Sequence, residues 1–173
     1  MDPWSISSIT AAAMPQAFSF LFDRLSHLLD HWHDKKNQSE TPEAPAALQG
    51  ELGTLVVNEP IFLRHQAELQ NLAGALGSYV RNPERLSTED EALVIQLGRL
   101  RGLLEEVYGR ALSFDGETDR PETGTRVEQR VDSVTGTVLG VDGVQDGPTH
   151  VVQQAKSVEA GGWLIGVRSD KRQ

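Results

Sequence analysis

The chain of 173 residues contains no cysteine. This absence excludes disulfide bonds, thiol nucleophiles, and zinc or iron–sulfur centres that are held by cysteine. A chain without cysteine fits the reducing interior of a cell, so we expect a cytoplasmic protein. The N-terminus also lacks the basic start of a secretory signal, because its second residue is Asp2.

Basic residues are in short supply. The chain has 16 Lys and Arg against 25 Asp and Glu, which gives a formal net charge of −9. Nucleic-acid binding needs clustered Lys and Arg that displace counterions. Electrostatic adhesion to an anionic membrane needs basic clusters as well. The charge balance therefore argues against both, and we expect no nucleic-acid partner.

The sequence also lacks the short motifs that mark common enzyme sites. Gly-x-Ser-x-Gly, which carries the nucleophile of many hydrolases, does not occur, and neither does the phosphate-binding loop Gly-x-x-x-x-Gly-Lys-Ser/Thr. The glycines at 136, 140 and 143 have no helical pattern behind them, which removes a dinucleotide-binding interpretation. We therefore expect no enzymatic activity and no cofactor.

Two histidines are the candidates for a metal site. His27 and His31 are four residues apart on an expected helix, with Asp23 and Asp34 nearby. That spacing puts both imidazoles on one face, as in helical zinc sites. No Glu follows the first histidine to act as a general base, and the polar face of an amphipathic helix explains the pair better. We assign no metal site, and a metal-dependent enzyme using this pair is the weakest of three interpretations.

Residues 1–36 form an apolar and amphipathic N-terminal segment, uncharged from Pro3 to Phe22. Apolar residues spaced by three and four predict a helix over 16–35. A bundle core explains most of the aromatic residues, whereas Trp4 and the small residues after it exceed what a three-helix core needs. Such a segment can enter a membrane or a groove on a partner. The residues that we assign to this contact are Trp4, Ile6, Ile9, Phe18 and Phe22.

Two helices and two linkers are predicted for the middle of the chain. Residues 37–49 are polar and contain two prolines, which predicts a mobile linker. Residues 50–114 predict a helical hairpin, with helices over about 60–81 and about 88–112, that completes a small bundle with the N-terminal helix. Thr88 and Glu91 have the spacing of a capping box. Residues 115–124, rich in Gly, Asp and Glu, predict a second linker.

The pattern changes to short strands over 125–170. Val, Thr and Gly dominate, and the segment predicts strands over about 127–132, 134–141, 149–155 and 163–168. The segment also repeats itself: 127–134 recurs as 151–158, about 24 residues later, and Leu-Gly-Val at 139–141 recurs as Ile-Gly-Val at 165–167 after a two-residue slip that Gly161 and Gly162 can absorb. A short repeat of this kind cannot bury its apolar face alone, so we expect the two copies to stack as rungs.

Stacking predicts which residues of the two copies face each other. Asp132 faces Lys156, a favourable charge pair, and Val131 faces Ala155, which keeps the contact apolar. The differences between the copies thus fall where like charges would otherwise meet. The residues that we assign to assembly are Val127, Gln129, Val131, Val134, Val138, Val151, Gln153, Val158, Trp163 and Ile165.

Two phrases, Val-Thr-Gly-Thr-Val-Leu-Gly at 134–140 and Val-Val-Gln-Gln-Ala-Lys-Ser-Val-Glu-Ala-Gly-Gly at 151–162, carry a family resemblance. In these phrases and in its plan the chain resembles bacterial amyloid-signalling effectors with HeLo-like or Bell-like helical domains, which are similar in plan to fungal HeLo-type cell-death proteins. The resemblance implies a helical domain that begins with an apolar helix, a mobile linker, a C-terminal segment whose rungs stack as a β-solenoid, and a role in bacterial defence.

The sequence as a whole predicts an α+β protein in which a small N-terminal helical bundle precedes a C-terminal β-repeat. The β-repeat is either a two-rung solenoid-like stack or a small closed β-module. We expect a non-enzymatic self-assembly protein whose partner is another copy or a protein with a matching β segment. On activation its N-terminal helix would contact a membrane. The alternative is an adaptor subunit of a larger assembly, with a closed β-module and an N-terminal helix that docks into a neighbour.

Overall fold

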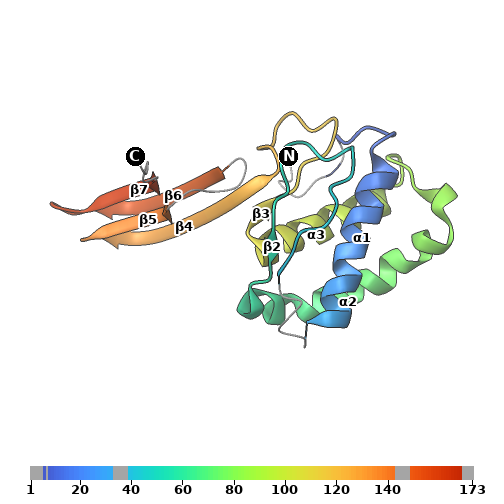
Figure 1. Cartoon of the computed structure of the whole chain (residues 1–173), viewed down its shortest axis with the longest axis horizontal. Helices are drawn as coiled ribbons and strands as arrows, with labels where there is room; N and C mark the ends of the chain where they lie inside the picture. The colour runs from blue at the N-terminus through green and yellow to red at the C-terminus, as the bar shows by residue number, and fades with distance from the viewer. Residues whose placement is uncertain (1–5, 7, 33–38, 143–148, 169–173) are drawn as a thin grey trace.

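The computed structural model describes residue 6 and residues 8–32, 39–142 and 149–168. The described residues up to 123 form a helical body. The strands from Gly124 onwards form a β-arm that projects from one side of this body (Figure 1). Helices thus come first and paired strands last, which confirms the predicted α+β class.

Three α-helices dominate the described part of the body: α1 (Met14–His31), α2 (Glu59–Arg81) and α3 (Glu91–Tyr108). The first turn of a helix has backbone amides without a partner inside the helix, and residues at the start of each helix compensate for them. Proline, which has no amide to satisfy, lies in the first turn of α1 and of α2, and the Asn58 side chain accepts a hydrogen bond from the Ile61 amide at 3.4 Å.

The ends of α3 differ from the sequence prediction. Asp90, rather than Thr88, caps its start, because the Asp90 carboxylate accepts a hydrogen bond from the Leu93 amide at 3.1 Å. The predicted capping box is therefore wrong. The helix also ends at Tyr108 instead of 112, since Gly109 adopts a left-handed conformation with φ 60° and its amide donates to the Glu105 carbonyl.

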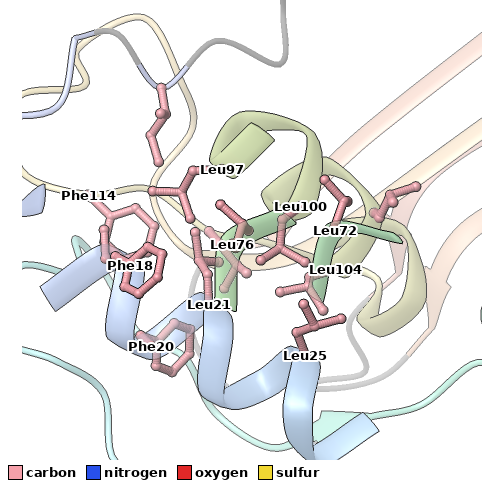
Figure 2. Close-up of a cluster of buried hydrophobic side chains, with 14 of the residues drawn as sticks. Phe18, Phe20, Leu21, Leu25, Leu72, Leu76, Leu97, Leu100, Leu104 and Phe114 are labelled. Carbon is pink, nitrogen blue, oxygen red and sulfur yellow. The ribbon is translucent and has the colours of Figure 1, made fainter. Parts of the chain in front are cut away.

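The three helices bury one continuous apolar core. Leucines and phenylalanines from α1, α2 and α3 converge on it, and Phe114, beyond the last helix, closes one side (Figure 2). Phe18 stacks on Phe22 with ring centroids 5.7 Å apart and meets Tyr79 edge-on at 6.3 Å. No described residue after Phe114 belongs to this core. The helical body therefore has an apolar interior of its own, separate from the β-arm.

The described residues before α1 are not helical. Residues 11–13 form a turn, and α1 begins at Met14, close to the predicted start at 16. Ile6 and Ile9 instead insert into the core of the body. The Thr10 amide donates to the Asp115 carbonyl at 2.9 Å, which ties this stretch to the far end of the body.

Both predicted linkers pack against the body where they are described. In the first, β1 (Ser39–Glu40) pairs antiparallel with β2 (Leu55–Val56), and the Ala47 amide donates to Gln16 at 3.0 Å. In the second, Glu117 and Thr123 are buried. The prediction of a mobile linker is therefore wrong for 39–49, and the second linker also packs against the body. Residues 37 and 38 lie outside the described residues.

The β-arm has two arches. The first is β4 (Gly124–Val134) followed by β5 (Thr137–Asp142), and the second is β6 (Thr149–Val158) followed by β7 (Trp163–Arg168). Strand β4 pairs in parallel with β6, and β5 pairs in parallel with β7. At its root β4 also pairs antiparallel with β3 (Arg110–Ala111), which joins the arm to the body. We refer to the β4–β5 arch as rung one and to the β6–β7 arch as rung two.

Replacing Gly109 by Ala should lower the free energy of unfolding by about 1 kcal/mol, because alanine is disfavoured in the left-handed conformation that ends α3. Gly74→Ala is the matched control. Gly74 lies within α2 with no atom in the way of a Cβ, so alanine there should raise stability by about 0.5–1 kcal/mol. Urea denaturation followed by helical circular dichroism measures both, and equal effects of the two variants would contradict the assignment of the helix end.

Candidate functional site: the stacked β-arm

The two copies of the repeat lie on top of each other in the register that the sequence predicts. Gln129 is the partner of Gln153, Ser133 of Ser157 and Val134 of Val158. In the second sheet Leu139 is the partner of Ile165, which places the Leu-Gly-Val and Ile-Gly-Val triplets side by side. The arm is thus a two-rung stack of the solenoid-like kind.

A pair of glutamines connects both rungs and both sheets of the arm. The Gln153 side-chain amide donates to Gln129 Oε1 at 2.7 Å, from rung two to rung one. The Gln129 amide in turn donates to the Leu139 carbonyl at 3.0 Å, from β4 across to β5. Because both side chains are partly buried, these bonds are better shielded from water than surface bonds. The recurrence of glutamine at this offset therefore has a structural cause.

The turn of rung two absorbs the two-residue slip between the copies. Four residues, 159–162, connect β6 to β7, whereas only residues 135 and 136 connect β4 to β5. The Glu159 amide donates to the Val134 carbonyl and the Trp163 amide to the Gly136 carbonyl, both at 2.9 Å. Gly161 has φ 89°, which glycine adopts at no steric cost. The two turns therefore stay bonded although their lengths differ.

The predicted charge pair is present. Lys156 Nζ lies 2.5 Å from the Asp132 carboxylate, with both side chains more than four-fifths exposed. A surface pair of this kind adds little stability. The pair instead favours the observed register, because shifting one rung along the other would separate the two opposite charges.

Rung two exposes apolar residues that rung one buries. Val134 is 2% exposed, whereas its repeat Val158 is 51% exposed; Val141 is 8% exposed and its repeat Val167 is 48% exposed. The rung-two residues Trp163 and Leu164 are exposed as well. Each rung covers one side of the other. Among the described residues, Val158 and Val167 of rung two nevertheless lack the cover that Val134 and Val141 of rung one have.

The assigned assembly residues divide accordingly. Val134 is buried, Val158 and Trp163 are exposed, and the others are half-buried within the stack: Val127, Gln129, Val131, Val138, Val151, Gln153 and Ile165. The structure therefore brings all ten together in the β-arm. Of these ten residues, only Val158 and Trp163 are exposed apolar side chains in the single chain.

The outer side of rung one is covered only at its root. Strand β3 pairs with Gly124 and Thr125 and no further along β4. Beyond that point a groove of about 1210 Å³ separates the arm from the body, and Val127 and Arg130 of β4 line it together with Tyr108 of α3. Most of the outer edge of β4 thus lies clear of the body.

The residues assigned to a membrane or partner helix are placed elsewhere. Ile6, Ile9 and Phe18 are buried in the core of the body, and Phe22 is half-buried against it. In this folded state they cannot form the predicted contact surface, because their apolar atoms already pack against the three helices. Trp4 lies outside the described residues.

The histidine pair lies beside an acidic residue that the sequence did not indicate. His27 Nε2 is 3.3 Å from the Glu40 carboxylate, and the His27 and His31 rings lie 4.8 Å apart. Arg24 binds the same carboxylate at 2.5 Å. Among the described residues, no three His, Asp or Glu side chains are grouped so that they could hold a metal ion. Asp34 lies outside the described residues.

A buried ionic network holds the root of the arm. Arg101 on α3 pairs with Glu117, and Arg120 pairs with Glu105 of α3; Arg101, Glu105 and Glu117 are almost fully buried. The two carboxylates also accept backbone amides, Glu105 from Leu112 at 2.8 Å and Glu117 from Phe114 at 2.9 Å. These bonds fix the segment that runs from α3 into β4.

Burial of the charged Arg101 guanidinium is energetically unfavourable. Burial, and next the nearby charge of Arg120, lower the pKa of the Arg101 guanidinium, whereas Glu117 and Glu105 raise it. Burying a charge is unfavourable unless partners compensate it closely. The sequence contains little sign of this site, because arginine in a helix is mostly exposed, whereas Arg101 is buried.

No helix in the described part of the chain is long and apolar enough to cross a membrane. Comparison with protein-family models, with curated proteins and with solved structures found no match to this chain.

Replacing Glu117 by Ala should lower the free energy of unfolding by about 3–5 kcal/mol, because the Arg101 charge would stay buried without the carboxylate that pairs with it. Glu68→Ala removes the partner of Arg99 on the exposed surface and should cost no more than about 1 kcal/mol. Chemical denaturation of both variants provides the comparison. Similar losses in the two would show that the buried pair does not hold the root of the arm.

Proposed function

We propose that this protein is a non-enzymatic self-assembly protein whose copies join through the β-arm. One observation carries the proposal. Within a single chain two rungs stack in parallel and in register, and the second rung leaves its strand edges and apolar side chains uncovered. A surface that already binds its own repeat within one chain is suited to bind the same repeat in another.

The strand edges of rung two favour pairing with another chain. Among the described residues, β6 ends the sheet of β3, β4 and β6, and β7 pairs with β5 alone. An edge strand presents a row of unpaired amides and carbonyls, which proteins often protect with proline. Neither β6 nor β7 contains proline. Strand addition would satisfy these backbone groups.

Joining copies through the arm would concentrate the helical bodies. Each copy contributes two rungs, so a stack advances by about 9.5 Å per copy. A single helix is about 10–12 Å wide with its side chains, and the body packs three of them. Successive bodies therefore have to fan out around the stack, as the natural twist of parallel strands allows. The product is a cluster of bodies at high local concentration.

The resemblance to amyloid-signalling effectors supports the assembly step, since their plan also places a repeat of stacking rungs after a helical domain. A protein with a matching β segment would use the same edges and is the alternative partner. Membrane contact is not part of the proposal, because Ile6, Ile9 and Phe18 lie in the core of the body. The adaptor hypothesis is less favoured, because a closed module would cover its own strand edges.

Deleting residues 125–173 should convert oligomers of the full chain into monomers while the helical signal is kept, because the core of the body contains no described residue after Phe114. Light scattering coupled to size-exclusion chromatography measures mass, and circular dichroism measures helix content. A chain that ends at residue 168 keeps both arches and serves as the control, which should assemble like the full chain. A full chain that stays monomeric, or a deletion variant that still assembles, would contradict the proposal.

A further inference from the structure

Glycine at position 140 is dictated by the neighbouring rung. A Cβ added to Gly140 of rung one would lie 2.4 Å from the Gly166 carbonyl oxygen and 2.6 Å from a methyl group of Val151, both in rung two. Real Cβ atoms do not approach other atoms within 3.0 Å. Any larger residue at 140 would therefore push the rungs apart. The missing side chain makes room for rung two.

Gly166 occupies the same register position in rung two but has no such neighbour. Its flanking residues Ile165 and Val167 pair with Leu139 and Val141, which flank Gly140. A Cβ on Gly166 would meet nothing within 4 Å, and its φ is not in the left-handed region. Glycine inside a strand is unfavourable unless another group approaches closely. No described residue of the single chain supplies that reason for Gly166.

A second pair of glycines shows the same difference in the opposite direction. A Cβ on Gly162 of rung two would lie 2.4 Å from the Val134 carbonyl oxygen of rung one. Its register equivalent in rung one is Gly136, because Thr137 pairs with Trp163. A Cβ on Gly136 would meet nothing within 4 Å. Gly166 is thus open on the outer side of rung two, and Gly136 on the outer side of rung one.

We infer that rung one of a second copy stacks in parallel on rung two of the first, in the same register that joins the rungs within a chain. This inference rests on the proposed function. It specifies the direction in which the copies stack and the residues that meet between them. Gly166 then receives the Gly140 carbonyl and the Val127 side chain of the second copy, because Val127 repeats Val151. The second copy's Gly136 receives the Val158 carbonyl of the first.

The charges and the apolar residues of the arm fit this alternation of rungs. Lys156 would lie between Asp132 of its own chain and Asp132 of the second copy. Two second rungs stacked in parallel would instead place Lys156 on Lys156, and like charges directly opposite each other are unfavourable. The added rung would also cover Val158 and Val167, as rung two covers Val134 and Val141.

The test uses two variants of the full chain, Gly166→Ala and Gly136→Ala. Each adds one methyl group where the single chain has open space, so the folded arm should be unchanged by circular dichroism. Every interface between copies uses Gly166 of one copy and Gly136 of the other. Each variant alone should therefore assemble about tenfold more weakly or worse, because the added Cβ meets backbone of the next copy. Gly74→Ala on α2 is the control and should assemble like the wild type.

Mixing the two variants distinguishes polar stacking from other contacts. The Gly136→Ala chain keeps an intact rung-two side and the Gly166→Ala chain an intact rung-one side, so a mixture should form 1:1 dimers and stop there. Mass photometry with differently tagged chains measures this. If either variant alone assembles like the wild type, or if the mixture stays monomeric, the inferred register is wrong. A wild-type chain that does not assemble would instead refute the proposed function itself.

Discussion

The parallel pairing of β4 with β6 places each residue of the first rung against its repeat in the second, and the rest of the arm follows from this register. It sets Gln129 against Gln153 and Asp132 against Lys156, and it brings the Gly166 carbonyl over Gly140. The two rungs are nevertheless unequal, because Val134 and Val141 of rung one are buried whereas Val158 and Val167 of rung two are exposed. The interaction that stabilises the arm is thus the one that leaves it incomplete.

The body and the arm are stabilised by different means. The body has an apolar core to which α1, α2, α3 and Phe114 contribute, and no described residue of the arm belongs to it. The arm has few fully buried residues and depends on ladder hydrogen bonds and the glutamine pair. The network of Arg101, Glu117, Glu105 and Arg120 connects the two, because it fixes the segment between α3 and β4.

Several sequence predictions failed for reasons that are physical and local. Ile6 and Ile9 looked surplus to a three-helix core, but the core also needs apolar residues beyond the helix ends, where Phe114 packs. The first linker looked too polar to be ordered, yet its backbone groups pair with the body, as in the bond from the Gln49 amide to the Ser113 carbonyl. Composition cannot show such pairing, because it depends on segments that are far apart in the chain.

The sequence by itself determined the presence of three helices, the four strands of the arm and the register of the repeat. Helical spacing is a local signal, and the repeat carries its own pairing partner a fixed number of residues away. Only the tertiary structure decided that Arg101 is buried, that the N-terminal isoleucines lie in the core, and that rung two is uncovered. These features depend on which surfaces meet in space. Gly140 and Gly166 illustrate this difference between sequence and tertiary structure. They are the same residue at the same register position, and they differ only in what lies next to them.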